Sequence, residues 1–132
     1  MAQGSIITSP TGGKRRLGPY RGALGALFGI AAAGALTRLL ESGYDPALPF
    51  LVAPLGASAV LVFAVPASPL AQPWPVLGGN LISAMVGLAL GHLLGDPWLA
   101  GSLAVASAIA VMTLTRSLHP PGGACALLCA LA

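Results

Sequence analysis

"TRSLHPPGGACALLCALA" (residues 115–132) is the stretch that decides which fold to expect. Two prolines, Pro120 and Pro121, run directly into Gly122 and Gly123 inside a region that is otherwise almost wholly apolar. Proline at the first position of a helix gives up an N–H that would be unpaired there anyway, and glycine allows other groups to approach closely. The stretch is therefore predicted to start a helix.

The composition places this helix in a membrane. Hydrophobic residues make up 56% of the 132 positions and charged residues 7%, whereas about a quarter of the residues in a soluble domain are charged. No Asp, Glu, Lys or Arg occurs between Pro46 and Gly95. At about 1.5 Å per helical residue, that stretch can cross a bilayer core of roughly 30 Å twice. The sequence predicts an integral, multi-pass membrane protein in contact with the lipid bilayer.

The apolar segments predict an all-α, polytopic transmembrane helix bundle with four spans and the start of a fifth. The four spans are expected at residues 21–40, 50–65, 76–95 and 97–115. Residues 1–20 form a polar, basic N-terminal segment, and residues 21–132 form the transmembrane domain. Only about 12 residues follow Pro120, some 18 Å if helical, which cannot span the membrane, so we expect either a chain that is incomplete at its C-terminus or a fold that is incomplete without a partner.

Basic residues cluster beside the first span, where such residues commonly fix membrane orientation. The cluster consists of Lys14, Arg15, Arg16 and Arg21. It predicts a cytoplasmic N-terminus in a bacterial inner membrane, with Glu41, Asp45 and Asp96 outside and Arg116 inside. The cluster also accounts for the net charge of +3, so nucleic acid is not expected as a partner.

Small residues predict where the helices pack, because helices in lipid associate where backbones can approach closely. Such residues recur every fourth position along the third span, at Gly79, Ser83, Gly87, Gly91 and Gly95. The third span is therefore predicted to be the centre of the bundle. A similar seam in the fourth span consists of Ala100, Ala104 and Ala108. A solute path along the glycine stripe is the alternative to packing alone.

Two segments with matching breaks suggest an inverted repeat. "APLGASAVLVF" (residues 53–63) aligns with "HPPGGACALLC" (residues 119–129), so that Pro54 matches Pro120 and Gly56 matches Gly122. Each segment follows a Leu-Thr-Arg sequence in the preceding span, and those spans cross the membrane in opposite directions. Both segments are predicted to be helices interrupted by proline and glycine.

Inverted repeats with interrupted helices recur in secondary transporters, where the half-helix ends bind solute near the membrane centre. Exposed amides at such a helix start carry the positive end of the helix dipole and attract an anion. The alternative is that both helix starts serve folding alone. The candidate binding residues are Pro54, Gly56, Ala57, Ser58, Asn80, His119, Pro120, Pro121, Gly122 and Gly123, together with the amide of Ala124.

The remaining reactive side chains suggest neither a metal site nor catalysis. Cys125 and Cys129 lie four residues apart with no further cysteine to complete a tetrahedral site, so they are interpreted as small packing residues. No metal or other cofactor is expected. An intramembrane enzyme would need a nucleophile with a base, or a metal cluster, and the sequence suggests no catalytic residue.

Residues 53–87 together with "SLHPPGGA" (residues 117–124) resemble the HPP family of integral membrane proteins, named for its His-Pro-Pro motif. Plant chloroplast and cyanobacterial members are associated with nitrite transport. The resemblance therefore implies a membrane permease or channel for a small inorganic anion, with nitrite as the first candidate. The alternative is a membrane anchor or sensory module that transports nothing and couples to a soluble partner. A homo-oligomer is a further expectation.

Overall fold

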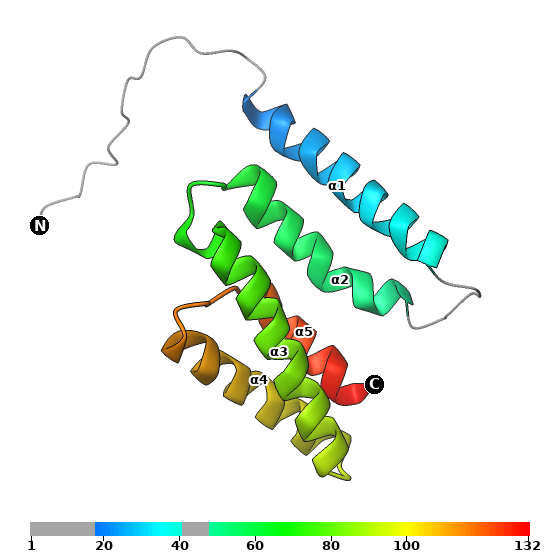
Figure 1. Cartoon of the computed structure of the whole chain (residues 1–132), viewed down its shortest axis with the longest axis vertical. Coiled ribbons are helices and arrows are strands. Elements are labelled where there is room, and N and C mark those ends of the chain that lie inside the picture. The colour runs from blue at the N-terminus through cyan, green and yellow to red at the C-terminus, as the bar shows by residue number, and fades with distance from the viewer. Residues whose placement is uncertain (1–17, 41–47) are drawn as a thin grey trace, which may run out of the picture.

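The computed structural model describes residues 18–40 and 48–132, and the regular elements in that part of the chain are helices, as predicted. The α-helices are α1 (Gly18–Leu40), α2 (Leu48–Ala59), α3 (Pro73–Leu93), α4 (Pro97–Leu114) and α5 (Pro121–Leu131) (Figure 1). A π-helical turn, η1 (Val60–Ala64), extends α2, and a 3₁₀ turn, η2 (Pro69–Ala71), precedes α3. The predictions for residues 1–17 and for Glu41 and Asp45 lie outside the described residues.

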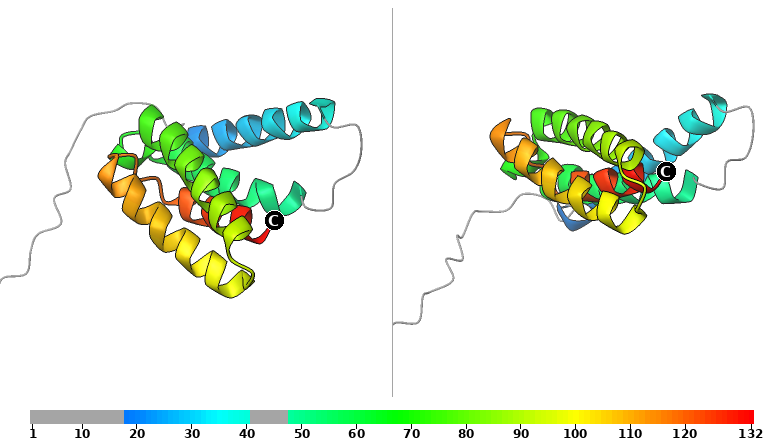
Figure 2. Two further views of the ribbon diagram at one scale, coloured as in Figure 1. Left: turned by 60° about the horizontal axis from the view of Figure 1, so that its bottom comes forward. Right: turned by 90° about the horizontal axis from the view of Figure 1, so that it is seen from below.

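Helix α3 packs along both α4 and α5 (Figure 2), as its glycine stripe predicted, but the predicted central position belongs to α5, which packs on α2, α3 and α4. A Cβ atom on Gly87 would collide with the carbonyl oxygen of Ala126, and one on Gly91 would lie 2.5 Å from the carbonyl oxygen of Ala130. The missing side chains let the backbone of α5 lie directly on α3. Gly95, at the end of the stripe, has nothing within 4 Å of its Cβ position.

Alanines form the seam between α4 and α5. Ala104, Ala108 and Ala126 are fully buried and form one core cluster with Met112. Because lipid tails are as apolar as leucine side chains, helix association depends on close van der Waals contact across such small residues. The predicted alanine seam of α4 is therefore confirmed; it faces alanines of α5, and three partly buried residues of α3 pack against the same cluster.

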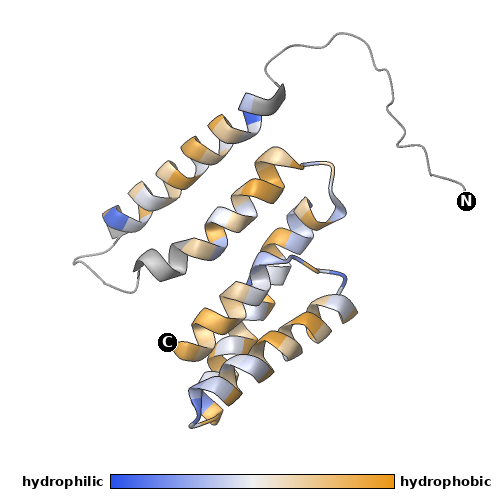
Figure 3. Cartoon of the chain, turned by 180° about the vertical axis from the view of Figure 1, so that it is seen from behind, coloured by the Kyte–Doolittle hydropathy of each residue, from blue (hydrophilic) through white to orange (hydrophobic). Residues whose placement is uncertain are grey.

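The apolar surface of the described helices fits a membrane. Strong hydrophilic colour lies mainly at helix ends and connections (Figure 3). Three segments are long and apolar enough to cross a bilayer: Tyr20–Leu39, Pro73–Leu93 and Pro97–Leu114. The second predicted span, residues 50–65, coincides with α2 and the π-helical turn η1, which together run from residue 48 to residue 64. The chain is an integral, multi-pass membrane protein built as a helix bundle.

One aromatic side chain joins α1 to the rest of the bundle. The ring of Phe63, in the π-helical turn, lies so close to α1 that a Cβ on Gly25 would be 2.6 Å from its Cδ1 atom. A Cβ on Gly29 would be 2.9 Å from its Cε2 atom. The glycines of α1 therefore form a groove for this ring, and α1 lies beside α2 (Figure 1).

The contact between α3 and α5 predicts how alanine substitution at two glycines will differ. Gly87→Ala puts a methyl group against the α5 backbone, and overpacking of this kind costs about 1–3 kcal/mol. Gly34→Ala in α1 meets nothing within 4 Å, and alanine is the better helix former by about 1 kcal/mol. We expect Gly87→Ala to lose monodisperse protein at a lower temperature than wild type, and Gly34→Ala to match or exceed wild type. Heating followed by size-exclusion chromatography checks this, and equal losses in both variants would contradict the packing.

Candidate functional site

The His-Pro-Pro turn begins where α4 ends. The N–H of Ser117 donates to the carbonyl of Met112 at 2.8 Å, and the N–H of Arg116 donates to that of Thr113 at 3.3 Å. These are the two bonds of a Schellman motif, which normally places glycine in the left-handed position. Here Arg116 occupies that position with φ 54°. The turn redirects the chain toward α3, so that the residues after Ser117 enter the protein.

His119 is fully buried and uses both ring nitrogens. Its Nδ1 lies 2.9 Å from the carbonyl oxygen of Leu70 in η2. Its Nε2 lies 2.9 Å from Oγ of Ser58 in α2. One imidazole therefore joins three segments: α2, the connection before α3, and the turn before α5.

The partners of His119 assign its tautomer. A carbonyl oxygen can only accept, so Nδ1 carries the proton and donates to Leu70. In the neutral ring Nε2 is then an acceptor, and the hydroxyl of Ser58 must donate to it. Buried polar groups without partners are costly. The three groups satisfy one another only in this arrangement while the imidazole is neutral.

Glycines make room for the turn beneath α3. A Cβ on Gly79 would be 2.5 Å from the carbonyl oxygen of Ser117 and 2.8 Å from Cβ of His119. A Cβ on Gly122 would be 2.6 Å from Oγ of Ser83. Ser117, before His119 in the chain, and Gly122, after it, thus both lie against α3. These two contacts fix the position of His119 relative to α3.

The predicted helix start at Pro54 is wrong. Helix α2 begins at Leu48 and contains Pro54 in its interior. The amides of Gly56, Ala57 and Ser58 therefore lie inside a helix, where N–H groups bond to carbonyls one turn earlier. They are not open donors for an anion. Helix α2 already begins at Leu48, upstream of Pro54. The alignment of Pro54 with Pro120 compared only the residues from Ala53 onward.

The second predicted helix start exists, but its first amides are already bonded. Helix α5 begins at Pro121, after Pro120. The N–H of Gly122 donates to the carbonyl of His119 at 2.8 Å, and the N–H of Gly123 donates to that of Pro120 at 3.1 Å. The two aligned segments therefore differ in their boundaries, and paired helix starts do not face one another.

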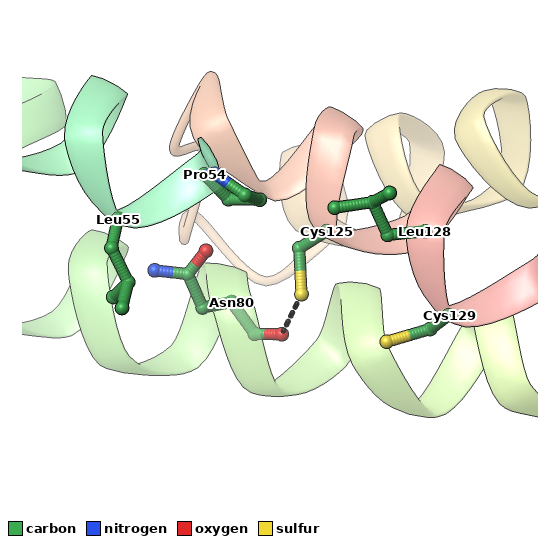
Figure 4. A pocket seen from close by; sticks show the side chains of 6 residues that line it. All are labelled: Pro54, Leu55, Asn80, Cys125, Leu128 and Cys129. Carbon is green, nitrogen blue, oxygen red and sulfur yellow. Dashed lines mark hydrogen bonds between the residues drawn. The ribbon is translucent and has the colours of Figure 1, made fainter. Parts of the chain in front are cut away.

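Asn80 lies on a half-open cavity of about 160 Å³ between α2, α3 and α5. Its Nδ2 donates to the carbonyl of Val76 at 2.9 Å, within its own helix. Figure 4 shows the Asn80 side chain facing Pro54 across this cavity. The walls are mostly apolar, and the lining residues are Pro54, Leu55, Asn80, Cys125, Leu128 and Cys129.

The cavity and the Ser58–His119 pair are neighbours. Pro54 lies one helical turn before Ser58 on α2, and Gly79, which contacts His119, directly precedes Asn80 on α3. The structure therefore brings together Pro54, Ser58, Asn80 and His119. Gly56, Ala57 and Pro120 are exposed, and Gly123 has nothing within 4 Å of its Cβ position.

Sequence reasoning missed the Leu70 carbonyl, Ser117 and the placement of the two cysteines on the cavity. A backbone carbonyl carries no residue signature, so nothing in the sequence marks Leu70 as a partner of His119. Ser117 is fully buried and its Oγ lies 2.7 Å from Oγ of Thr115. Ser117 directly follows Arg116, the left-handed residue of the turn after α4, and nothing in the sequence marks Arg116 as left-handed.

Comparison with known proteins identifies the family. A family model described as "HPP, transmembrane region" matches residues 15–132. The chain belongs to the HPP family. The resemblance noted from the His-Pro-Pro stretch is thereby confirmed. No solved structure matches the chain.

Two relatives are transmembrane proteins of Dictyostelium discoideum. One is 44% identical over 91 residues, which cover 66% of this chain and 32% of the relative. The other is 46% identical over 86 residues, which cover 62% of this chain and 28% of the relative. The chain spans about a third of the length of these relatives. The activity of a whole HPP protein is therefore only proposed for this chain.

The hydrogen bond between Ser58 and His119 predicts a difference between two serine substitutions. Ser58→Ala leaves the buried Nε2 without a donor, which costs about 1–3 kcal/mol. Ser102→Ala removes an exposed hydroxyl that bonds to the Trp98 carbonyl of its own helix at 2.7 Å, and such surface changes stay within about 0.5 kcal/mol. Unfolding by SDS in mixed micelles measures both. Equal midpoints for the two variants would show that the Ser58 bond contributes nothing.

The adjacent glycines of the motif predict opposite tolerances. Gly122→Ala places a methyl group 2.6 Å from Oγ of Ser83 and 3.0 Å from Sδ of Met112, which we expect to cost about 1–3 kcal/mol. Gly123→Ala meets nothing within 4 Å, and we expect it to unfold at the wild-type temperature or above. Thermal unfolding followed by circular dichroism distinguishes them, and a less stable Gly123→Ala than Gly122→Ala would contradict this placement of the turn.

Proposed function

We propose that this HPP membrane domain is a permease or channel for a small inorganic anion, and that the solute passes the region where α2, α3 and α5 meet. The observation that carries the proposal is the buried Ser58–His119 pair beside the Asn80 cavity. Ionisable groups in membrane proteins are costly to bury and typically mark solute or proton pathways. The role proposed is transport without catalysis.

The irregular geometry of α2 supports the same region. Pro54 lies inside the helix, and an internal proline removes one backbone hydrogen bond. The π-helical turn η1 follows directly after Ala59, and such turns occur frequently at functional sites. Ser58 therefore lies between two irregularities of its helix, in a segment that can change conformation at lower cost than a regular helix.

The hydrogen-bond chemistry of His119 suggests how an anion could be accommodated. A proton added to Nε2 turns that nitrogen from an acceptor into a donor, so the Ser58 hydroxyl no longer donates to it. The imidazolium charge and the freed hydroxyl then offer an anion a counter-charge and a donor beside the cavity. An anion in an apolar cavity needs such compensation. The proposed transport therefore moves one proton with each anion.

Nitrite is the first substrate to test, because the HPP resemblance suggests it and a monovalent anion of that size suits a small cavity. The alternative is a membrane anchor or sensory module that transports nothing. The same uptake assay distinguishes it from a permease. The cytoplasmic N-terminus and a homo-oligomer also stay predictions. The bacterial inner membrane stays a prediction too, and the two relatives described above come from Dictyostelium discoideum.

Uptake of nitrite into proteoliposomes containing the whole chain tests the proposal. We expect uptake above that of empty vesicles, faster when the exterior is the more acidic side. His119→Asn should lower the protein-dependent rate by about tenfold and remove its response to the pH gradient, because asparagine cannot take up the proton that the proposal places on Nε2. Ser102→Ala, with its hydroxyl on an exposed face, should transport as wild type does.

Empty vesicles are the essential control, because nitrous acid crosses bilayers without a protein. Folded protein that adds nothing to the background for nitrite, nitrate or formate would overturn transport and favour the anchor or sensory module. Uptake that His119→Asn leaves unchanged in rate and pH response would retain transport but exclude the proposed role of the imidazole.

A further inference from the structure

The two cysteines of α5 have no role in the proposed transport, although both line the cavity that Asn80 faces. Figure 4 shows the Cys129 sulfur turned toward Cys125, and the Cys125 sulfur turned toward α3. The distance from Cys125 Sγ to the Asn80 carbonyl oxygen is 3.6 Å. Both side chains are only partly buried, and neither thiol forms a disulfide.

We propose that Cys125 and Cys129 form a binding site for a soft monovalent metal ion of the Cu⁺ type. Side chains four residues apart on a helix have Cβ atoms about 5–6 Å apart. Metal–thiolate bonds of about 2.3 Å require two sulfur atoms about 4.6 Å apart for linear coordination, which this spacing allows. Thiolate ligands select soft metals, among them Cu⁺, zinc and the iron of iron–sulfur clusters.

Two ligands are enough for such an ion. The missing third cysteine excludes a tetrahedral thiolate site of the zinc type, and in the described part of the chain no group of three or more His, Cys, Asp or Glu side chains comes together. A two-coordinate ion does not need a third side chain. The site therefore discriminates by coordination number as well as by ligand softness.

A second hollow gives the ion a way to the thiols. It has a volume of about 500 Å³ and lies at the connection between α3 and α4, with Gly91, His92 and Cys129 in its lining. Cys129 belongs to the lining of both hollows. The imidazole of His92 is exposed and is a suitable first ligand for copper at the entrance. Cys129 would then receive the ion before Cys125 completes its coordination.

Anaerobic titration of the whole chain in detergent with Cu⁺ tests the site, with bicinchoninate as the competing chelator. We expect one Cu⁺ per chain to be withheld from the chelator. Cys125→Ser and Cys129→Ser should each weaken binding by tenfold or more, on the order of 1.4 kcal/mol. The matched control is the double variant Cys125→Ser with Leu127→Cys, which keeps two thiols but moves one to an exposed face of α5, and it should bind as weakly as Cys125→Ser.

Three results would overturn the proposal: either serine variant binding as wild type does, the double variant recovering wild-type affinity, or no retention of Cu⁺ by the wild-type protein. A second measurement covers variants that fail to fold. In the wild-type chain, bound Cu⁺ should slow the alkylation of both cysteines by maleimide, read by mass spectrometry, and unchanged rates at either cysteine would also contradict the site. None of these readings depends on whether the protein transports an anion.

Discussion

The structure depends on the places along α3 where side chains are missing. Gly79, Gly87 and Gly91 each lie so close to the chain of the α5 region that a single added carbon atom would meet a carbonyl oxygen. In a membrane, where the hydrophobic effect between helices is absent, contact at this range is the main source of association. The position of α5, and of everything attached to it, follows from these three glycines.

The positions of the candidate functional residues depend on that contact between α3 and α5. Because the turn before α5 lies against Gly79, His119 is held below α3, where it meets Ser58 of α2 and the Leu70 carbonyl together. Because α5 continues along α3, its two cysteines face Asn80 across a small cavity. Close packing at the glycines of α3 thus determines which polar groups come into contact.

The sequence was sufficient for features that depend on side-chain size and polarity. The packing face of α3 and the alanine seam of α4 could be predicted, since small residues at every fourth position point to one face. The Pro54 helix start could not, because proline is compatible with both the start and the interior of a membrane helix, and only the upstream residues decide. The partners of His119 were equally hidden, because Ser58 is distant in sequence and Leu70 contributes only its backbone.

Arg116 does two things at once: it adopts the left-handed conformation of the turn after α4, and it places a charge at the end of that helix. Its left-handed φ of 54° is a conformation that costs a non-glycine residue about 1–2 kcal/mol, so glycine would end α4 with less strain. Glycine would leave the end of this apolar helix without a charge, however, and a basic residue at the end of a span biases that end toward the cytoplasm during insertion. The residue in the left-handed position therefore also carries the charge at the end of this apolar helix, and the turn is less stable than the same turn with glycine would be.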